Sequence, residues 1–350
     1  MNVALILPPR STFLVVLESI IAIVFMCLAL AGNLTVCLAI SRHKFLRTVP
    51  NFLLLNLAIA DIFNALVSFP LLVSVLVNGV WNFHETVCQF QAFQSYASYA
   101  CSLLTLAVTS ITRYYATVHP VKHRAKFKVK TVCWMIVVIW IASLLFASAP
   151  LLGWGKYKFE PFYAVCIHDH NFSEAYNTFL FLFLIANSSV IVTCYSKIFK
   201  ATKMRHRQVH SLFGQGSSSR QLNVITQQEI KLTNTIFIVI CLFALCYLAT
   251  IVLGFLMYTP VDVPRFARMI STFSVGLTSV VNPMVYWVRS KTFRDALRGI
   301  FGKKDLALQD SGRINASDWN SLDPSGLASR NSSSVNRKRA STLNFEDTNL

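Results

Sequence analysis

Residues 88–118 decide the fold: they read CQFQAFQSYASYACSLLTLAVTSITRYYATV, a long stretch whose one charged residue is Arg113. Six more apolar stretches lie at about 13–40, 52–77, 131–152, 172–199, 233–258 and 267–288. Each can cross a hydrocarbon core about 30 Å thick, which takes about 20 residues of helix. Inside lipid, backbone N–H and C=O groups must pair within their own segment, so each stretch should be a helix. The sequence predicts an all-α membrane protein, a seven-transmembrane helix bundle.

Composition supports one membrane domain and excludes nucleic acid as a partner. Of the 350 residues, 54% are hydrophobic, which is more than a soluble domain of this size can bury. The formal net charge is +17, and binding of nucleic acid would need that charge on one exposed domain. Instead, Lys and Arg occupy short connections between the apolar stretches, where they can also touch anionic lipid headgroups.

The placement of these charges predicts the topology. Lys and Arg follow the first, third, fifth and seventh stretches, whereas none occurs between Asn78 and Glu85. Since basic residues concentrate on the cytoplasmic side, we expect a multi-pass plasma-membrane protein with its N-terminus outside. We expect no cleaved signal peptide, because the first apolar run is too long for one. The predicted parts are an outer segment over 1–12, a membrane domain over 13–303 and a disordered cytoplasmic tail over 304–350.

The end of the membrane domain and the tail carry short motifs. Residues 292–301 place Phe293, Leu297, Ile300 and Phe301 on one helical face and Arg294 and Arg298 on the other, which predicts a short amphipathic eighth helix on the inner membrane surface. Residues 337–342 (RKRAST) are similar to a kinase substrate, and Leu350 ends a sequence similar to a PDZ ligand. We therefore consider kinases, arrestin and a PDZ protein as partners of the tail.

Two features belong to the outer side of this topology. Of nine cysteines, Cys88 and Cys166 both face the oxidising side, which predicts a disulfide that holds the second outer loop over the bundle. Asn171 begins an Asn-Phe-Ser acceptor for N-glycosylation in the same loop. Similar triplets at Asn33 and Asn187 lie in spans, and those at Asn315 and Asn331 in the tail, so we expect none of these four to be modified.

Charged residues within spans are functional candidates because they are costly in lipid. Asp61 is the only acid in the middle of a span, and polar residues are expected at the same depth. These residues are Asn33, Ser102, Thr278, Ser279 and Asn282. They could hold a sodium ion, or they could form a hydrogen-bonded hub that only joins the helices. The spacing does not choose between these two.

Arg113 stands at the inner end of the third span. It could be a boundary cation whose side chain reaches the interface. Alternatively, it could pair with Glu229 at the start of the sixth span and hold one packing of the helices until the pair opens.

Motifs in order along the seven spans resemble rhodopsin-like (class A) G-protein-coupled receptors over about residues 13–303. They are Gly32-Asn33, Asn56 to Asp61, Cys88 with Cys166, Thr112-Arg113-Tyr114, Trp140, Tyr195, Phe243 with Cys246, Asn282-Pro283-Met284-Val285-Tyr286, and Phe293-Arg294. The resemblance implies that Arg113 pairs with Glu229 when inactive and contacts a heterotrimeric G protein when active. It also implies sodium at Asp61, Ser102 and Asn282, and inward motion of Tyr195 and Tyr286 on activation.

Three positions depart from the family pattern. Thr112 replaces the acid that usually precedes the switch arginine, which predicts raised basal activity. Asn187 replaces the proline of the fifth helix. Residues 246–249 (CYLA) lack both the tryptophan and the proline of the sixth, so that helix loses its usual kink.

We expect the ligand to bind among outer-half residues of the spans and the second outer loop. The expected pocket residues are Gln91, Ser95, Tyr96, Tyr99, Glu160, Tyr247, Phe273 and Gly276. Ser95 stands where amine receptors place an acid, which argues against an amine. The loop is similar to those of opsins, but Gly276 takes the place of the retinal lysine and no span interior contains a lysine. Covalent retinal is therefore not expected, and an extracellular small or lipidic ligand, melatonin-like in type, is favoured.

Other classes of function fit less well. A transporter usually shows internal repeats around a midplane site, and no repeat is found here. No catalytic constellation is present, so we do not expect an enzyme. A non-covalent light or retinoid sensor remains an alternative within the receptor class.

Overall fold

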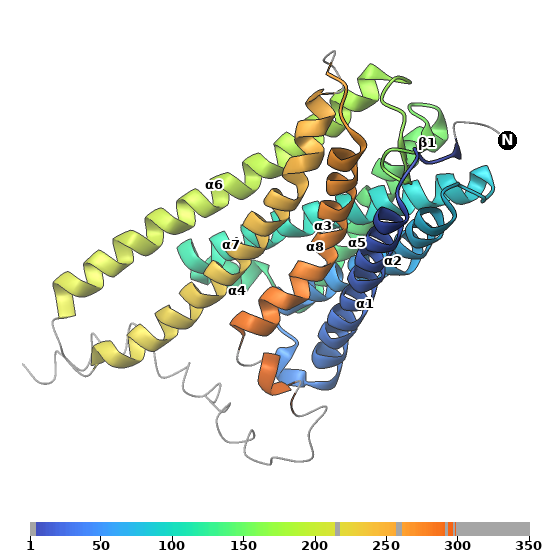
Figure 1. Ribbon diagram of the computed structural model, residues 1–350. Coiled ribbons are helices and arrows are strands. Elements are labelled where there is room, and N and C mark those ends of the chain that lie inside the picture. The colour runs from blue at the N-terminus through green and yellow to red at the C-terminus, as the bar shows by residue number, and fades with distance from the viewer. Residues whose placement is uncertain (1–4, 214–217, 257–260, 291–292, 297, 299–350) are drawn as a thin grey trace, which may run out of the picture. The chain divides into compact units, whose positions relative to one another are not determined.

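The structure, a computed structural model, describes residues 5–213, 218–256, 261–290, 293–296 and 298, without the side chains of 205–232. Within these residues, seven helices have 20 or more residues, and each overlaps one of the seven predicted spans (Figure 1). Helices α6 and α7 extend well beyond their predicted spans. They are α1 Thr12–Arg42, α2 Val49–Asn78, α3 Glu85–Val118, α5 Val129–Ser148, α6 Glu174–Phe213, α7 Ser218–Leu256 and α8 Arg265–Arg289. The chain divides into two units, Met1–Leu297 and Arg298–Leu350, and of the second only Arg298 is described.

Five of these helices are long and apolar enough to cross a membrane: α1, α2, α5 with the turn after it, and parts of α6 and α7. Among the described helices, α3 and α8 do not reach that threshold because many of their positions are polar. Those polar residues are turned inward: α3 buries Gln91, Ser98 and Thr105, and α8 buries Ser271 and Asn282. Composition alone therefore understates how much of the bundle spans lipid.

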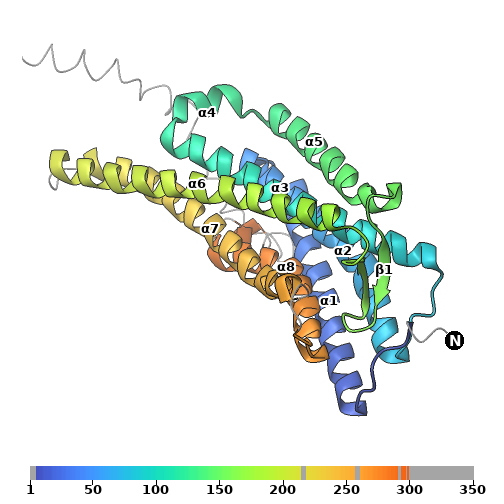
Figure 2. The same ribbon diagram turned by 90° about the horizontal axis from the view of Figure 1, so that it is seen from above.

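Helix α3 lies at the centre of the bundle, in contact with α2, α5 and α6, while α1 packs on α2 and α8, and α7 packs on α8 (Figure 2). A buried polar cluster fixes the α2–α3–α5 contact. The Asn56 amide donates to Thr105 Oγ1 at 2.8 Å, and Trp140 Nε1 donates to Asn56 Oδ1 at 2.8 Å. Each polar group is satisfied, so the cluster specifies how the three helices are arranged.

Gly32 permits close contact between α1 and α8. A Cβ atom there would lie 2.6 Å from Pro283 Cγ, so only glycine fits without movement. The same approach lets Asn33 Nδ2 donate to the carbonyl of Ser279 at 2.9 Å. Asn33 therefore joins two helices.

A β-hairpin, which the sequence did not predict, covers one end of the bundle. Strands β1 Tyr157–Glu160 and β2 Val165–His168 pair antiparallel with Tyr157 opposite His168. The predicted Cys88–Cys166 disulfide is confirmed and ties β2 to the start of α3. We call this end the hairpin end.

The chain before α1 also belongs to the hairpin end. The Leu7 amide donates to the Gly79 carbonyl, and the Trp81 amide donates to the Leu5 carbonyl, both at 2.9 Å. Gly79 ends α2 in the left-handed conformation (φ 71°), which glycine adopts without strain. The first described residues are thus held against the α2–α3 connection.

Glu18 of α1 forms a buried ion cluster that the sequence reasoning missed. Arg265 donates two hydrogen bonds of 2.7 Å to the two Glu18 carboxylate oxygens. Arg10 contacts the same carboxylate at 3.3 Å and donates to the Leu76 carbonyl at 2.8 Å. The cluster links the N-terminal segment, α1, α2 and α8.

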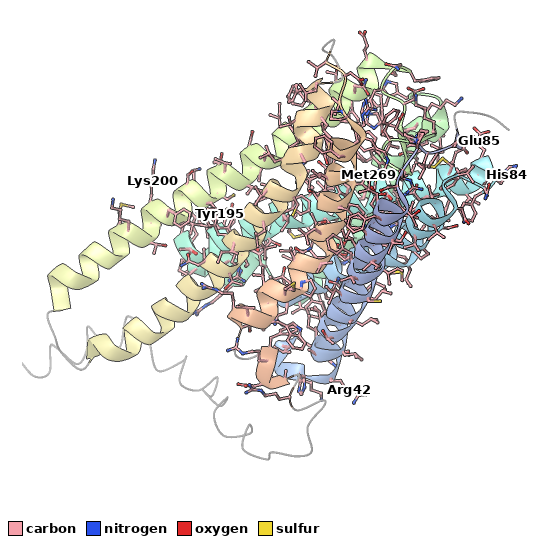
Figure 3. The ribbon with its side chains drawn as sticks, in the orientation of Figure 1. Arg42, His84, Glu85, Tyr195, Lys200 and Met269 are labelled. Atoms are coloured by element: carbon pink, nitrogen blue, oxygen red, sulfur yellow. A yellow bond between two sulfur atoms is a disulfide. The ribbon has the colours of Figure 1, made fainter. Side chains whose placement is uncertain are left out.

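The opposite end, which we call the Arg113 end, carries basic residues. Figure 3 shows Arg42 at the far end of the bundle from His84 and Glu85. A short helix α4, Pro120–Lys126, follows α3 there. Of the predicted amphipathic helix, residues 293–296 and 298 are described and helical, with Phe293 buried; residues 292, 297 and 299–301 lie outside the described residues. The proposed boundary at 303 also lies outside them.

Candidate functional site

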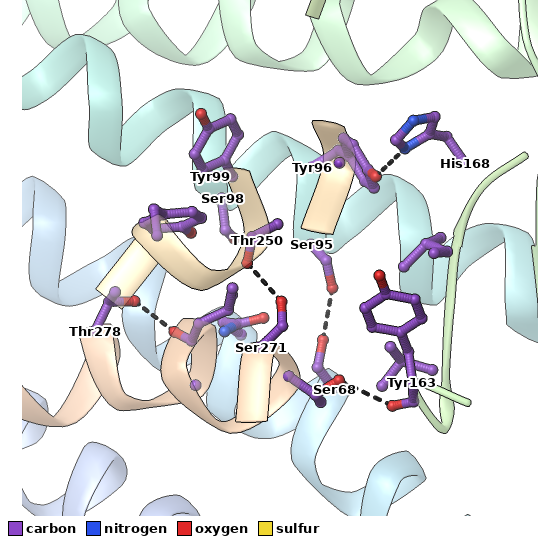
Figure 4. Close-up of a pocket in the computed structure, with 18 of the residues that line it drawn as sticks. Ser68, Ser95, Tyr96, Ser98, Tyr99, Tyr163, His168, Thr250, Ser271 and Thr278 are labelled. Carbon is purple, nitrogen blue, oxygen red and sulfur yellow. Dashed lines mark hydrogen bonds between the residues drawn. The ribbon is translucent and has the colours of Figure 1, made fainter. Parts of the chain in front are cut away.

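A single continuous cavity of about 520 Å³ runs from the hairpin into the centre of the bundle. Its walls come from α2, α3, α6, α7, α8 and strand β2 (Figure 4). Six of the eight expected pocket residues line it: Gln91, Ser95, Tyr96, Tyr99, Tyr247 and Gly276.

Glu160 and Phe273, also expected in the pocket, do not line it. Burial alternates along β1, so Tyr157 and Phe159 point inward while Glu160 turns the other way and lies 3.9 Å from Arg268. Phe273 packs edge-on against Phe25, with ring centroids 6.2 Å apart, in the core between α1 and α8.

Hydroxyl groups are the main polar features of the cavity wall. Ser68 and Ser95 share a hydrogen bond of 2.8 Å between α2 and α3. Thr250 and Ser271 share one of 2.7 Å between α7 and α8. Sequence reasoning missed Ser68, Thr250 and Ser271, although isolated hydroxyl residues in apolar spans mark inward positions.

Two histidines of the hairpin region complete the upper wall. His168 hydrogen-bonds Tyr96, and its ring lies 4.0 Å from that of His170. Burial, and then the charge of the other histidine, lowers the pKa of His168 to about 3. Burial, and then Lys158, lowers the pKa of His170 to about 4. Both are therefore neutral near pH 7. Alternation from Cys166 along β2 could have predicted that His168 faces inward.

Asp61 forms the floor of the cavity and is the only formally charged residue among the described lining residues. Its two carboxylate oxygens accept hydrogen bonds from Ser279 Oγ at 2.8 Å and Asn282 Nδ2 at 2.9 Å. Ser102 and Thr278 also line the cavity, whereas Asn33 hydrogen-bonds backbone carbonyls instead. Carboxylate and hydroxyl oxygens suit a hard cation, so this donor set fits sodium without Asn33.

Gly276 lies in the cavity wall against Phe69. A Cβ atom there would be 3.0 Å from Phe69 Cζ, so even a small side chain requires that ring to shift.

The Arg113 end holds the predicted switch residues. Arg113 is 3% exposed. Thr112 is fully buried, and its hydroxyl donates to the Thr109 carbonyl at 2.8 Å. Tyr195 and Tyr286 are buried, and the Tyr195 hydroxyl has no hydrogen-bond partner among the described residues. The side chain of Glu229 lies outside the described residues, so its pairing with Arg113 stays a prediction.

Tyr114, the neighbour of Arg113, sits under a cation at the same end. Lys197 Nζ lies 5.6 Å from the centre of the Tyr114 ring, and the Tyr114 hydroxyl is 3.3 Å from His119 Nε2. Pro283, the remaining switch position, is buried inside α8.

A model of the family described as "7 transmembrane receptor (rhodopsin family)" matches residues 32–286. The chain belongs to the rhodopsin family of seven-transmembrane receptors. Together with the apolar helices, this makes the receptor a multi-pass membrane protein.

Similar proteins span several receptor types. Rattus norvegicus melanopsin is 27% identical over 76% of the receptor and 57% of its own length. Phodopus sungorus melatonin receptor type 1A is 26% identical over 83% of the receptor and 82% of its own length. The receptor thus spans less than two thirds of the melanopsins it matches. The crystal structure of squid rhodopsin has the same fold, with a TM-score of 0.78, 22% identity, and coverage of 86% of the receptor and 91% of that chain.

Two helices of the receptor show how its departures are accommodated. Asn187 Nδ2 donates to the Phe183 carbonyl at 2.8 Å, inside a continuous α6. Helix α7 contains no proline and is continuous from Ser218 to Leu256. Tyr247, in place of the family tryptophan, stacks between Phe243 and Tyr99, with ring centroids 4.6 and 4.9 Å away.

Asn171 is exposed beside the hairpin. Its glycosylation stays a prediction. The tail motifs at 337–342 and at Leu350, with Asn315 and Asn331, lie outside the described residues.

Proposed function

We propose that the protein is a plasma-membrane receptor, with its N-terminus outside, that binds an extracellular small-molecule or lipidic ligand and activates a heterotrimeric G protein. One observation supports this proposal. In a rhodopsin-family bundle, helix α3 lines the cavity, whose part above Asp61 is uncharged, and also carries the buried Arg113 at the other end of the bundle. A ligand that prefers one packing of these helices shifts the equilibrium between states.

Arg113, Tyr195 and Tyr286 are the proposed coupling residues. The unpartnered Tyr195 hydroxyl favours motion, since a buried hydroxyl without a partner gains stability when it finds one. Sodium at Asp61, Ser102, Ser279 and Asn282 is the proposed regulator of the resting state. Arrestin, kinases and a PDZ protein are proposed partners of the tail.

The test is G-protein dissociation across the Gα classes, without added ligand, in cells that lack related receptors. Arg113→Ala should abolish basal coupling. Arg42→Ala, at an exposed arginine of the same end, is the matched control and should leave it unchanged. Equal coupling in all three proteins at equal surface expression would contradict the proposal, and a solute flux would favour a transporter.

Light provides the second arm of the test, because melanopsins are among the similar proteins. The proposed chemistry is non-covalent, since Gly276 offers no amine. Light-dependent coupling after addition of retinal would favour a light sensor; identical coupling in dark and light would favour the chemical ligand.

A further inference from the structure

The hairpin covers the end of the cavity that faces the outer aqueous solution in the proposed topology. Beyond the disulfide to α3, the Cys166 amide donates to Gln91 Oε1 at 2.9 Å. On the other side, Thr272 of α8 donates to the Tyr163 carbonyl at 3.0 Å. The hairpin is thus fixed to α3 and α8 across the cavity.

Apolar packing and a cation strengthen the α7–α8 side of this cover. Tyr163 is buried together with Leu253 of α7 and Val263 before α8. Arg268 of α8 lies over the Phe162 ring, with its guanidinium carbon 4.6 Å from the ring centre. A cover anchored at both sides leaves little room for a ligand to pass from the aqueous face.

The lateral wall between α6 and α7 is thinner. Phe181 of α6 and Phe255 of α7 both line the cavity, and the two residues are 40% and 54% exposed. Their rings meet edge-on with centroids 5.3 Å apart. This aromatic contact between α6 and α7 therefore lies in the wall of the cavity.

The neighbouring backbone position adds to the opening. Gly254 also lines the cavity, and a Cβ atom there would meet nothing within 4 Å. Phe181 lies seven residues into α6, about 10 Å from its start at 1.5 Å per residue. Exposed apolar side chains of Leu182 and Val252 lie beside the phenylalanines, so this surface faces acyl chains rather than water.

The chemistry of the wall limits what can pass and bind. Phenylalanine and leucine side chains form much of the α6 and α7 side, and the hydrogen-bonding groups of the wall include the hydroxyls of Ser95, Thr250 and Ser271. The only formal charge among the described lining residues is Asp61 at the floor. A volume of about 520 Å³ lies within the usual range of small-molecule sites, about 300–1,000 Å³.

We propose that the cavity binds a neutral, membrane-dissolved amphiphile, whose hydroxyl or amide end reaches these hydroxyls, and that it enters from the bilayer between Phe181 and Phe255. This rests on the proposed function in that the occupant of the cavity is the signalling ligand. The passage makes the local lipid leaflet, rather than bulk water, the reservoir from which the receptor is filled.

The test uses the full chain in phosphatidylcholine nanodiscs with a diazirine-bearing long-chain alcohol as probe. Photolabelling is followed over time and mapped to peptides. The wild type should accumulate label on the cavity peptides that contain Tyr96 and Tyr247. Gly254→Trp, which fills the opening, should slow this by about tenfold or more because passage then requires the helices to separate.

Phe255→Ala provides an independent variant that should speed the labelling. Leu182→Trp and Leu182→Ala are the matched controls, since Leu182 is exposed on the same surface but does not line the cavity. No cavity label in the wild type, or equal rates in wild type, Gly254→Trp and Phe255→Ala, would overturn the passage, as would equal slowing by Leu182→Trp. Photolabelling does not depend on G-protein coupling. If the wild type showed no basal G-protein dissociation in the Arg113 experiment, that result would count against the proposed function and not against the passage.

Discussion

Glu18 and Arg265 form a two-point ion pair between the first and last helices of the bundle, with both N–O distances 2.7 Å. Both side chains are largely buried, and Arg10 contacts the same carboxylate. A cluster of two arginines and one acid thus joins α1 to α8 at the hairpin end.

Glu18→Gln should therefore destabilise the protein by about 3 kcal/mol, because two mostly buried arginines lose their anion. Thermal unfolding in detergent, followed with a thiol-reactive dye on buried cysteines such as Cys101, measures this. Glu174→Gln, at an exposed acid of α6, is the control and should change little. Equal stability of the wild type and Glu18→Gln would show that the cluster contributes nothing.

Gly32→Ala should also lower the melting temperature. The new methyl group would meet Pro283 Cγ at 2.6 Å, and overpacking of this kind costs about 1–3 kcal/mol. Gly254→Ala is the matched change at an open helical position, where alanine should stabilise by up to about 1 kcal/mol. If both variants shift stability in the same direction, the α1–α8 contact is not the cause.

Thr112→Asp should lower basal G-protein coupling by about fivefold or more, if the coupling free energy has its usual size. A carboxylate next to Arg113 adds an ion pair that favours the resting state, whereas the present hydroxyl is satisfied by its own helix. Thr112→Asn has the same shape without the charge and should leave basal coupling near that of the wild type. A similar fall in both variants would assign the effect to packing.

The stability of the folded protein should fall as the pH drops below about 6.5. The folded-state pKa values of His168 and His170, about 3 and about 4, lie below the ordinary value of 6.5. Below pH 6.5 these histidines are therefore protonated in the unfolded chain but stay neutral in the folded protein. The stabilisation that is present above pH 6.5 is lost as the pH falls towards 4. The slope is at most about 1.4 kcal/mol per pH unit for each histidine.

Unfolding temperatures measured from pH 8 to pH 5 check this expectation. His170→Asn should flatten part of the dependence and leave that of His168. Asp169, which lies 3.0 Å from Lys158, stays charged throughout this range: burial raises the pKa of Asp169, but hydrogen bonds from Lys158 and the Asn171 amide lower it overall. A flat profile in the wild type would show that these histidines are not held neutral by the fold.

Sodium should reduce basal coupling of the wild type relative to an equal concentration of choline. Asp61→Asn removes the charge but keeps a partner for Ser279, so it should lose the difference between the two salts. Asn64→Asp, in the cavity lining one turn away, restores a nearby acid without the Ser279 and Asn282 contacts. If the double variant Asp61→Asn/Asn64→Asp recovers the sodium effect, the hydrogen bonds of residue 61 with Ser279 and Asn282 are not needed for it.

Most of the fold followed from the sequence because lipid restricts each span to a helix. The predicted span at 88–118 and helix α3 differ by three residues at one end. The hairpin was missed because four-residue strands leave no periodicity long enough to recognise. The sequence search for charges in mid-span passed over Glu18, which lies near the start of α1 and is paired with the nearby Arg10 and with Arg265, 247 residues away.

The site was predictable where helical phase decides which side chains face inward. Ser95, Tyr96 and Tyr99 of α3, which we expected in the pocket from their place in the outer third of the helix, line the cavity. Glu160 was wrong because strand alternation, unseen in the sequence, turns it towards Arg268. Phe273 was wrong because its ring packs against Phe25 of α1, a contact that no single span can reveal.

The contact of Gly276 with Phe69 limits which side chains residue 276 can carry. A lysine at residue 276, which covalent attachment of retinal would need, must occupy space where the Phe69 ring now lies. A lysine at residue 276 therefore requires the Phe69 ring to shift, in addition to the change of residue 276 itself.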